Sequence, residues 1–139
     1  MPGAEFLDTN ILVYAYDASD SRKQSLAQEL IRRALAGEFI ISVQVLSEFA
    51  STLFHKISPP ATAEQLVTIL DALAPIKTIS PDQETVRRAV EAHSTYGLHF
   101  YDAMIIAAAE QTACARIWSE DLNPGQEYFG IKVENPFTK

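Results

Sequence analysis

The sequence predicts an α/β protein with a mainly parallel central sheet of four to five strands and helices on both faces. Short apolar segments of strand length alternate along the chain with longer segments of helical periodicity, which is typical of repeated βαβ units. Of the 139 residues, 47% are hydrophobic and 21% are charged, as expected for one globular domain. No linker, repeat or low-complexity segment interrupts the chain, so we expect a single domain over residues 1–139.

Each predicted element is a stretch of regular hydrophobic periodicity bounded by capping or breaking residues. The run from Ala4 to Tyr16 is too long for one strand, so the capping residues Asp8-Thr9-Asn10 divide it into a strand and a short helix. The predicted strands are 4–7, 38–42, 76–79, 116–119 and 130–133. The predicted helices are a short one from about Thr9, then 22–36, 43–57, 62–73, 81–93 and one that includes 103–109.

Capping residues and breakers set the ends of these helices. Gly37 follows the second helix as a C-terminal stop, and Pro59-Pro60 separate the third helix from the fourth. Ser80 followed by Pro81 predicts the start of the fifth helix, because proline is favoured at the first helical position. The last helix is apolar on nearly all sides from Ala103 to Ala109, so we expect it to be covered all round.

The chain is acidic, with 18 acidic and 11 basic residues and a net charge of −7. This is the wrong sign for a protein that holds nucleic acid on a broad basic surface. It is compatible with a nucleic-acid enzyme whose carboxylates bind a metal ion, and equally with an acidic domain that has no such site.

The single cysteine, Cys114, excludes an intramolecular disulfide framework and a cysteine-based zinc site. The first 21 residues contain no lysine or arginine, so they do not resemble a signal peptide. The longest apolar run, Ala103 to Ala109, is seven residues long and far too short to cross a membrane. We therefore expect a cytoplasmic protein that does not contact a membrane.

Three acidic residues lie where α/β proteins bind ligands, at or just beyond the ends of strands and at a helix start. Asp8 ends the first strand, Asp121 follows the fourth, and Asp102 begins the buried helix. Taken singly, Asp8 and Asp102 could be helix caps and Asp121 a turn residue. Together, carboxylates at the core boundary repel each other unless a cation lies between them. They either bind a hard ion such as Mg²⁺ or Mn²⁺ or have raised pKa values.

Four segments, in order, resemble the acidic motifs of PIN-domain ribonucleases: 6–15 (FLDTNILVYA), 47–49 (SEF), 100–109 (FYDAMIIAAA) and 119–122 (SEDL). Residues 133–137 (VENPF) resemble the C-terminus of VapC-type toxins within that superfamily. The resemblance implies a three-layer PIN-like fold and an endoribonuclease that depends on Mg²⁺ or Mn²⁺ and hydrolyses RNA with a metal-activated water. It also implies a homodimer that is inhibited by a cognate antitoxin, as in type II toxin–antitoxin pairs.

The resemblance also assigns roles to residues. The implied catalytic residues form an acidic quartet: Asp8, Glu48, Asp102 and Asp121. Three of these, Asp8, Asp102 and Asp121, would be the metal ligands. The implied supporting polar residues, which would orient carboxylates or a water, are Thr9, Asn10 and Ser119.

Glu48 is the member of the quartet that periodicity does not support. On an ideal helix it lies about 200° from Leu46, nearly opposite the apolar stripe, so the pattern alone predicts a solvent-exposed side chain. Its assignment depends on the resemblance. Glu120, next to Asp121, is a rival for the fourth carboxylate.

Other functions remain open from the sequence. A receiver-like signalling domain also gathers carboxylates around Mg²⁺, but it needs a second acidic residue beside Asp8, where Thr9 and Asn10 stand. A haloacid-dehalogenase-like phosphatase needs Asp-x-Asp, and position 10 is Asn. A catalytically silent PIN-like module that binds metal or RNA would keep the acidic residues without cleaving its ligand.

Overall fold

A six-stranded sheet forms the centre of the protein in a computed structural model that describes residues 3–123 and 125–138. The strand order is β3-β2-β1-β4-β6-β5, and each neighbouring pair is parallel except the antiparallel pair β5 and β6. The strands are β1 Ala4–Leu7, β2 Phe39–Ser42, β3 Lys77–Ile79, β4 Cys114–Trp118, β5 Glu127–Tyr128 and β6 Ile131–Glu134.

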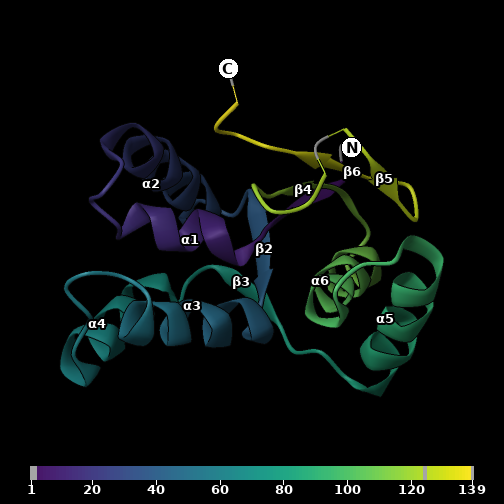
Figure 1. The fold of residues 1–139 in the computed structure, drawn as a ribbon, viewed down its shortest axis with the longest axis horizontal. Coiled ribbons are helices and arrows are strands. Elements are labelled where there is room, and N and C mark those ends of the chain that lie inside the picture. The colour runs from purple at the N-terminus through teal and green to yellow at the C-terminus, as the bar shows by residue number, and fades with distance from the viewer. Residues whose placement is uncertain (1–2, 124, 139) are drawn as a thin grey trace.

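Helices cover both faces of the sheet. In Figure 1, α1 to α4 lie on one side of β2, and α5 and α6 lie on the other. The helices are α1 Thr9–Ala15, α2 Ser21–Leu35, α3 Val43–His55, α4 Ala63–Leu73, α5 Gln83–Tyr96 and α6 Phe100–Gln111. The predicted α/β class, with a mainly parallel sheet between two helical layers, is therefore confirmed.

The sheet has six strands, one more than the upper end of the predicted four to five, and the additional strand is the short β5. This strand has two residues and forms a hairpin with β6 through Phe129 and Gly130, whose φ angles are +50° and +82°. Two consecutive left-handed residues are typical of a tight hairpin turn. A phenylalanine is rarely found in that conformation, and a two-residue strand has no alternation to detect.

The predicted start of α5 is also wrong. Asp82 is the N-cap, and its side chain accepts a hydrogen bond of 3.0 Å from the amide of Thr85. The hydroxyl of Thr85 in turn accepts a hydrogen bond of 3.0 Å from the amide of Asp82. This reciprocal capping box places the N-cap at Asp82 instead of the predicted Ser80, so the helix begins at Gln83.

The carboxyl ends of β1 and β4 lie side by side. Leu7 pairs with Trp118, and the amide of Asp8 donates a 3.0 Å hydrogen bond to the carbonyl of Trp118. Because the two strands are parallel, the residues that follow them emerge at the same edge of the sheet. The topology thus brings Asp8 together with the segment 119–121, which is more than 100 residues away in the chain.

Helix α6 is buried on nearly all sides, as its composition predicts. Ala103 and the five residues from Ile105 to Ala109 are all buried. The apolar helix fixes the position of its own first turn, which carries Asp102, against the sheet. None of the helices in residues 3–123 and 125–138 has the length and apolar character that a membrane crossing requires.

Candidate metal centre

Asp8 is buried at the carboxyl end of β1, with a side chain only 4% exposed. Its Oδ1 accepts a 2.7 Å hydrogen bond from the amide of Thr9, so it does cap α1. Its Oδ2 accepts a 2.8 Å hydrogen bond from the hydroxyl of Ser119. In the part of the chain that the structure describes, no lysine, arginine or histidine forms an ion pair with it. The capping role therefore leaves the negative charge of Asp8 uncompensated.

This environment raises the pKa of Asp8 to about 7 from its ordinary value of 3.8. Burial is the main cause, because it disfavours the charged form. The hydrogen bonds from Ser119 and Thr9 act in the opposite direction, and the negative charges of Asp102 and Asp121 raise the pKa further.

Asp102 lies in the first turn of α6 and is half-buried. Burial raises its pKa, and the charges of Asp121 and Glu48 raise it further, whereas nearby His99 lowers it. Asp102 is thus near enough to Asp8, Asp121 and Glu48 for each pair to interact electrostatically. The structure brings all four members of the predicted quartet into one neighbourhood.

Asn10 and Ser119 hold the segment that carries Asp121. Asn10 Nδ2 donates a 3.1 Å hydrogen bond to Oδ2 of the exposed Asp121, and Asn10 Oδ1 accepts one of 3.1 Å from the amide of Glu120. The buried Ser119 hydroxyl, which donates to Asp8, also accepts a 3.1 Å hydrogen bond from the amide of Asp121. These contacts are of the kind expected of supporting residues, and their part in catalysis stays a prediction.

The solvent-exposed position that periodicity predicts for Glu48 is wrong. Its side chain is half-buried, and its Oε1 accepts a 2.8 Å hydrogen bond from the hydroxyl of Thr9. Its Oε2 accepts a 2.8 Å hydrogen bond from Nε2 of Gln44, one turn earlier in α3. Helix α3 packs against α1 as well as β2, so a face that lies opposite its main apolar stripe is also covered.

Glu120, the alternative candidate for the fourth carboxylate, contacts residues outside the acidic quartet. It forms an ion pair with Lys23 of α2 and accepts a hydrogen bond from the hydroxyl of Tyr14. It is not among the charges that shift the pKa of Asp8 or Asp102. Of the two glutamates, Glu48 is the one that lies with the aspartates.

The donor chemistry of the quartet fits a hard divalent cation. Carboxylate oxygens are the ligands that Mg²⁺ and Mn²⁺ prefer. A cation would offset both the burial, which is the main cause of the raised pKa values of Asp8 and Asp102, and the repulsion from neighbouring carboxylates, which adds to it. The side chains are nevertheless spread apart. Within residues 3–123 and 125–138, no three acidic, histidine or cysteine side chains lie close enough together to hold one ion. Binding by three of them requires their side chains to move inward.

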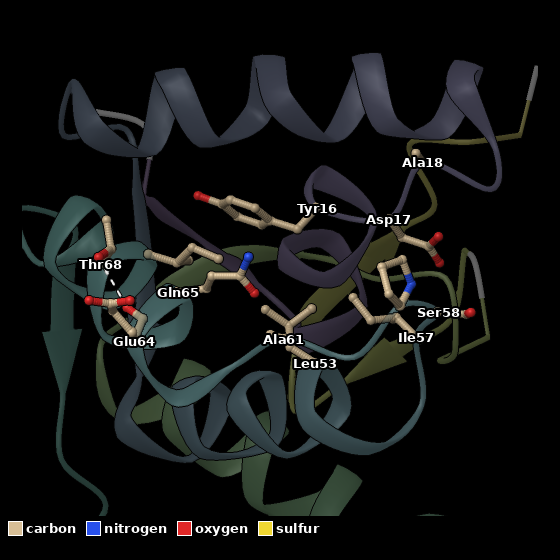
Figure 2. A pocket seen from close by; sticks show the side chains of 12 residues that line it. Tyr16, Asp17, Ala18, Leu53, Ile57, Ser58, Ala61, Glu64, Gln65 and Thr68 are labelled. Atoms are coloured by element: carbon tan, nitrogen blue, oxygen red, sulfur yellow. Dashed lines mark hydrogen bonds between the residues drawn. The ribbon is translucent and has the colours of Figure 1, made fainter.

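A cleft of about 410 Å³ adjoins this group and is lined by Glu48, Asp121 and the supporting Thr9 and Asn10, among others. A larger cavity of about 640 Å³ lies between the end of α1 and helices α3 and α4. Figure 2 shows Tyr16, Leu53 and Ala61 among the side chains that line it. None of the seven predicted site residues lines the larger cavity, so the smaller, polar cleft is the one that belongs to the acidic group.

The sequence contains three pairs of adjacent basic residues, and most of these side chains contact a glutamate; the pairs are Arg22-Lys23, Arg32-Arg33 and Arg87-Arg88. Lys23 pairs with Glu120, and the four arginines of the second and third pairs each contact a glutamate. Arg88, for example, donates two hydrogen bonds to the carboxylate of Glu110, one of 2.6 Å from Nε to Oε1 and one of 2.8 Å from Nη2 to Oε2. These pairs do not form a basic surface along the acidic cleft.

Sequence reasoning did not single out Gln44, which contacts Glu48 directly. The spacing of Gln44 and Glu48 by four residues in a predicted helix was a usable signal, because such residues are neighbours on a helix surface. Tyr14 and Lys23 contact Glu120 rather than Asp121, and no spacing in the sequence indicates this.

The sequence profile of the PIN domain matches residues 6–125. The chain therefore belongs to the PIN domain family. No curated protein matches the chain in sequence.

Solved structures share the fold at low sequence identity. A toxin–antitoxin complex from Klebsiella pneumoniae matches with a TM-score of 0.72 and 19% identity over 96% of this chain and 98% of that chain. DNA-bound VapBC from Salmonella typhimurium matches with a TM-score of 0.70 and 16% identity over 96% and 98%. VapC20 from Mycobacterium tuberculosis, a sarcin–ricin loop cleaving toxin, matches with a TM-score of 0.64 and 18% identity over 85% of this chain and 92% of that chain. These matches confirm the predicted PIN-like fold.

The raised pKa of Asp8 predicts how the free energy of unfolding depends on pH. Between about pH 4 and pH 7 the unfolded chain loses the Asp8 proton while the folded chain keeps it, because the folded pKa is raised to about 7. The contribution of Asp8 to stability therefore falls as pH rises through this window and is constant above it. Its shift of about three pKa units corresponds to roughly 4 kcal/mol.

We expect Asp8→Asn to raise the free energy of unfolding at about pH 8 by roughly 2 kcal/mol, because the amide avoids the buried charge but loses one strong hydrogen bond. At about pH 4 the gain should vanish. Urea denaturation at both pH values measures this, with Asp71→Asn on the exposed face of α4 as the control. A variant less stable than the wild type at the higher pH would contradict the assigned environment.

Proposed function

We propose that this protein is an endoribonuclease that depends on Mg²⁺ or Mn²⁺, and that it is the toxin of a type II toxin–antitoxin pair. The observation that carries the proposal is the buried, uncompensated Asp8 with its pKa raised to about 7 beside Asp102 and Asp121. Strongly perturbed carboxylates beside a cleft are typical of functional sites. Membership of the PIN domain family and the toxin–antitoxin structures that share the fold support the same function.

In this proposal Asp8, Asp102 and Asp121 hold the metal ion, and Glu48 completes the acidic quartet. When bound, a divalent ion supplies charge neutralisation at the phosphate and lowers the pKa of a water molecule. Asn10 keeps Asp121 directed toward the group, Ser119 orients Asp8, and Thr9 orients Glu48. The resemblance implies products with a 5′-phosphate and a 3′-hydroxyl, so no side chain needs to act as a nucleophile.

Electrostatics favour a cation at this site while RNA is bound. RNA is a polyanion, and the cleft is lined by three carboxylates, Glu48, Glu120 and Asp121, and one lysine, Lys56. Glu120 is paired with Lys23, whereas Glu48 and Asp121 have neutral partners. An empty site of this charge repels the phosphate that it would have to cleave. A divalent cation held by Asp8, Asp102 and Asp121 would offset this repulsion where the phosphate approaches.

Two partners belong to the proposal. The toxin–antitoxin complexes that share the fold favour a cognate antitoxin, and we expect it to place an arginine against the acidic group, where a guanidinium can bind carboxylates in a bidentate manner. A structure of the complex with no basic residue near Asp8 would argue against that contact. The resemblance to VapC-type toxins also favours a homodimer that acts on RNA in the cytoplasm, and sedimentation of the purified protein measures its oligomeric state.

The main test of the function is cleavage of RNA by matched variants. We expect Asp8→Asn and Asp102→Asn each to reduce cleavage in Mg²⁺ or Mn²⁺ by at least about a hundredfold, because each removes a negative ligand. Asp71→Asn and Glu120→Gln should cleave at close to the wild-type rate. Product ends and rates are measured on labelled RNA, with and without EDTA.

Two results would separate this function from its alternatives. Wild-type protein that binds Mn²⁺ in calorimetry but leaves every RNA intact would identify a catalytically silent binding module. Wild-type rates in Asp8→Asn or Asp102→Asn would show that the substituted residue has no part in the reaction.

A further inference from the structure

Gln44 connects Glu48 to the first turn of α6, which carries Asp102, through one side-chain amide. Its Nε2 donates a 2.8 Å hydrogen bond to Oε2 of Glu48 and a 3.0 Å hydrogen bond to the carbonyl of Tyr101. Tyr101 directly precedes Asp102 in the first turn of α6. The two hydrogens of a single NH₂ group therefore join the carboxylate on α3 to the helix that carries Asp102.

The orientation of this amide is fixed by its neighbours. If the amide were turned over, Oε1 would face a carboxylate and a carbonyl oxygen, and both contacts would be repulsive. In the observed orientation Oε1 is buried and lacks a hydrogen-bond partner among the described residues, and it is the one buried side-chain atom there with this property. Buried polar atoms without partners are rare in stable proteins and require a specific reason to be kept.

Repulsion within the quartet supplies that reason. The charge of Glu48 contributes to the raised pKa of Asp102, so the two carboxylates repel each other. Glutamate has a long side chain that can rotate away from a like charge. Two neutral donors prevent this, Thr9 at Oε1 and Gln44 at Oε2. Both oxygens of Glu48 are held without a cation that would compete with a metal ion for the site.

We infer that Gln44 is a positioning residue of the nuclease site, which keeps Glu48 directed into the acidic quartet and sets its place relative to Asp102. This inference rests on the proposed function for its consequence in catalysis. The geometry on which it stands does not depend on that function.

The test uses Gln44→Met, which keeps the length of the side chain and removes both hydrogen bonds. We expect RNA cleavage to slow about tenfold and the binding of Mn²⁺, measured by calorimetry, to weaken by a similar factor, because the charge of Glu48 would no longer be held beside the three metal ligands; losses of this size are usual when a residue that supports a metal site is removed. Gln28→Met is the matched control, because the Gln28 amide also donates to a backbone carbonyl, that of Ala15, away from the quartet.

A double-mutant cycle distinguishes positioning from a general effect on the fold. In a Glu48→Gln background, Gln44→Met should change Mn²⁺ affinity by less than about twofold, because its target is already neutralised. An equal loss in both backgrounds would overturn the inference. Gln44→Glu, which keeps the shape but replaces the donors with a charge, provides a second variant if Gln44→Met fails to fold.

Crystal structures of the wild type and Gln44→Met give a readout that is independent of activity. We expect the Glu48 carboxylate to leave its contact with Thr9 and turn away from Asp102 in the variant. An unmoved Glu48 would overturn the inference. If the wild-type protein neither binds Mn²⁺ nor cleaves RNA, the proposed function fails, while the position of Glu48 in the two structures still decides the role of Gln44.

Discussion

Asp8 lies buried at the carboxyl end of β1, and its carboxylate is contacted by a backbone amide and a serine hydroxyl. Burying a carboxylate without a positive partner is unfavourable, and this cost is the main cause of the raised pKa of Asp8. The position is set by the pairing of β1 with β4, which carries Ser119 and Asp121 to the same edge of the sheet. The other site contacts are arranged around this one buried charge.

The adjacent carboxylates of Glu120 and Asp121 have partners of different charge. Glu120 has an ammonium partner in Lys23 and a phenol in Tyr14. Asp121, the next residue, accepts a hydrogen bond from the neutral amide of Asn10, and Glu48 is held by Thr9 and Gln44. Neutral donors fix the direction of a carboxylate without cancelling its charge. The quartet is thus held in place while its negative charge stays available to a cation.

The fold class and most elements could be predicted from the sequence because the apolar pattern that encodes them is local. Asp8, Asp102 and Asp121 could be located for the same reason, since each lies at the end of an element that periodicity defines. The start of α5 depended on a reciprocal contact between Asp82 and Thr85, and β5 on an unusual backbone conformation at Phe129. The surroundings of Glu48 could not be predicted, because they depend on how α3 packs against α1, which no pattern within α3 records.

Burial in the first place, and repulsion between neighbouring carboxylates in the second, disfavour the charged forms of Asp8 and Asp102, so a bound cation should stabilise the quartet. The most direct measurement is a pH titration of the Asp8 carboxyl carbon by NMR, in metal-free protein and with saturating Mg²⁺. We expect a midpoint near the pKa of about 7 in the metal-free protein, and a midpoint displaced toward acid when Mg²⁺ is present. A midpoint at the ordinary value for an aspartate, unchanged by Mg²⁺, would contradict it.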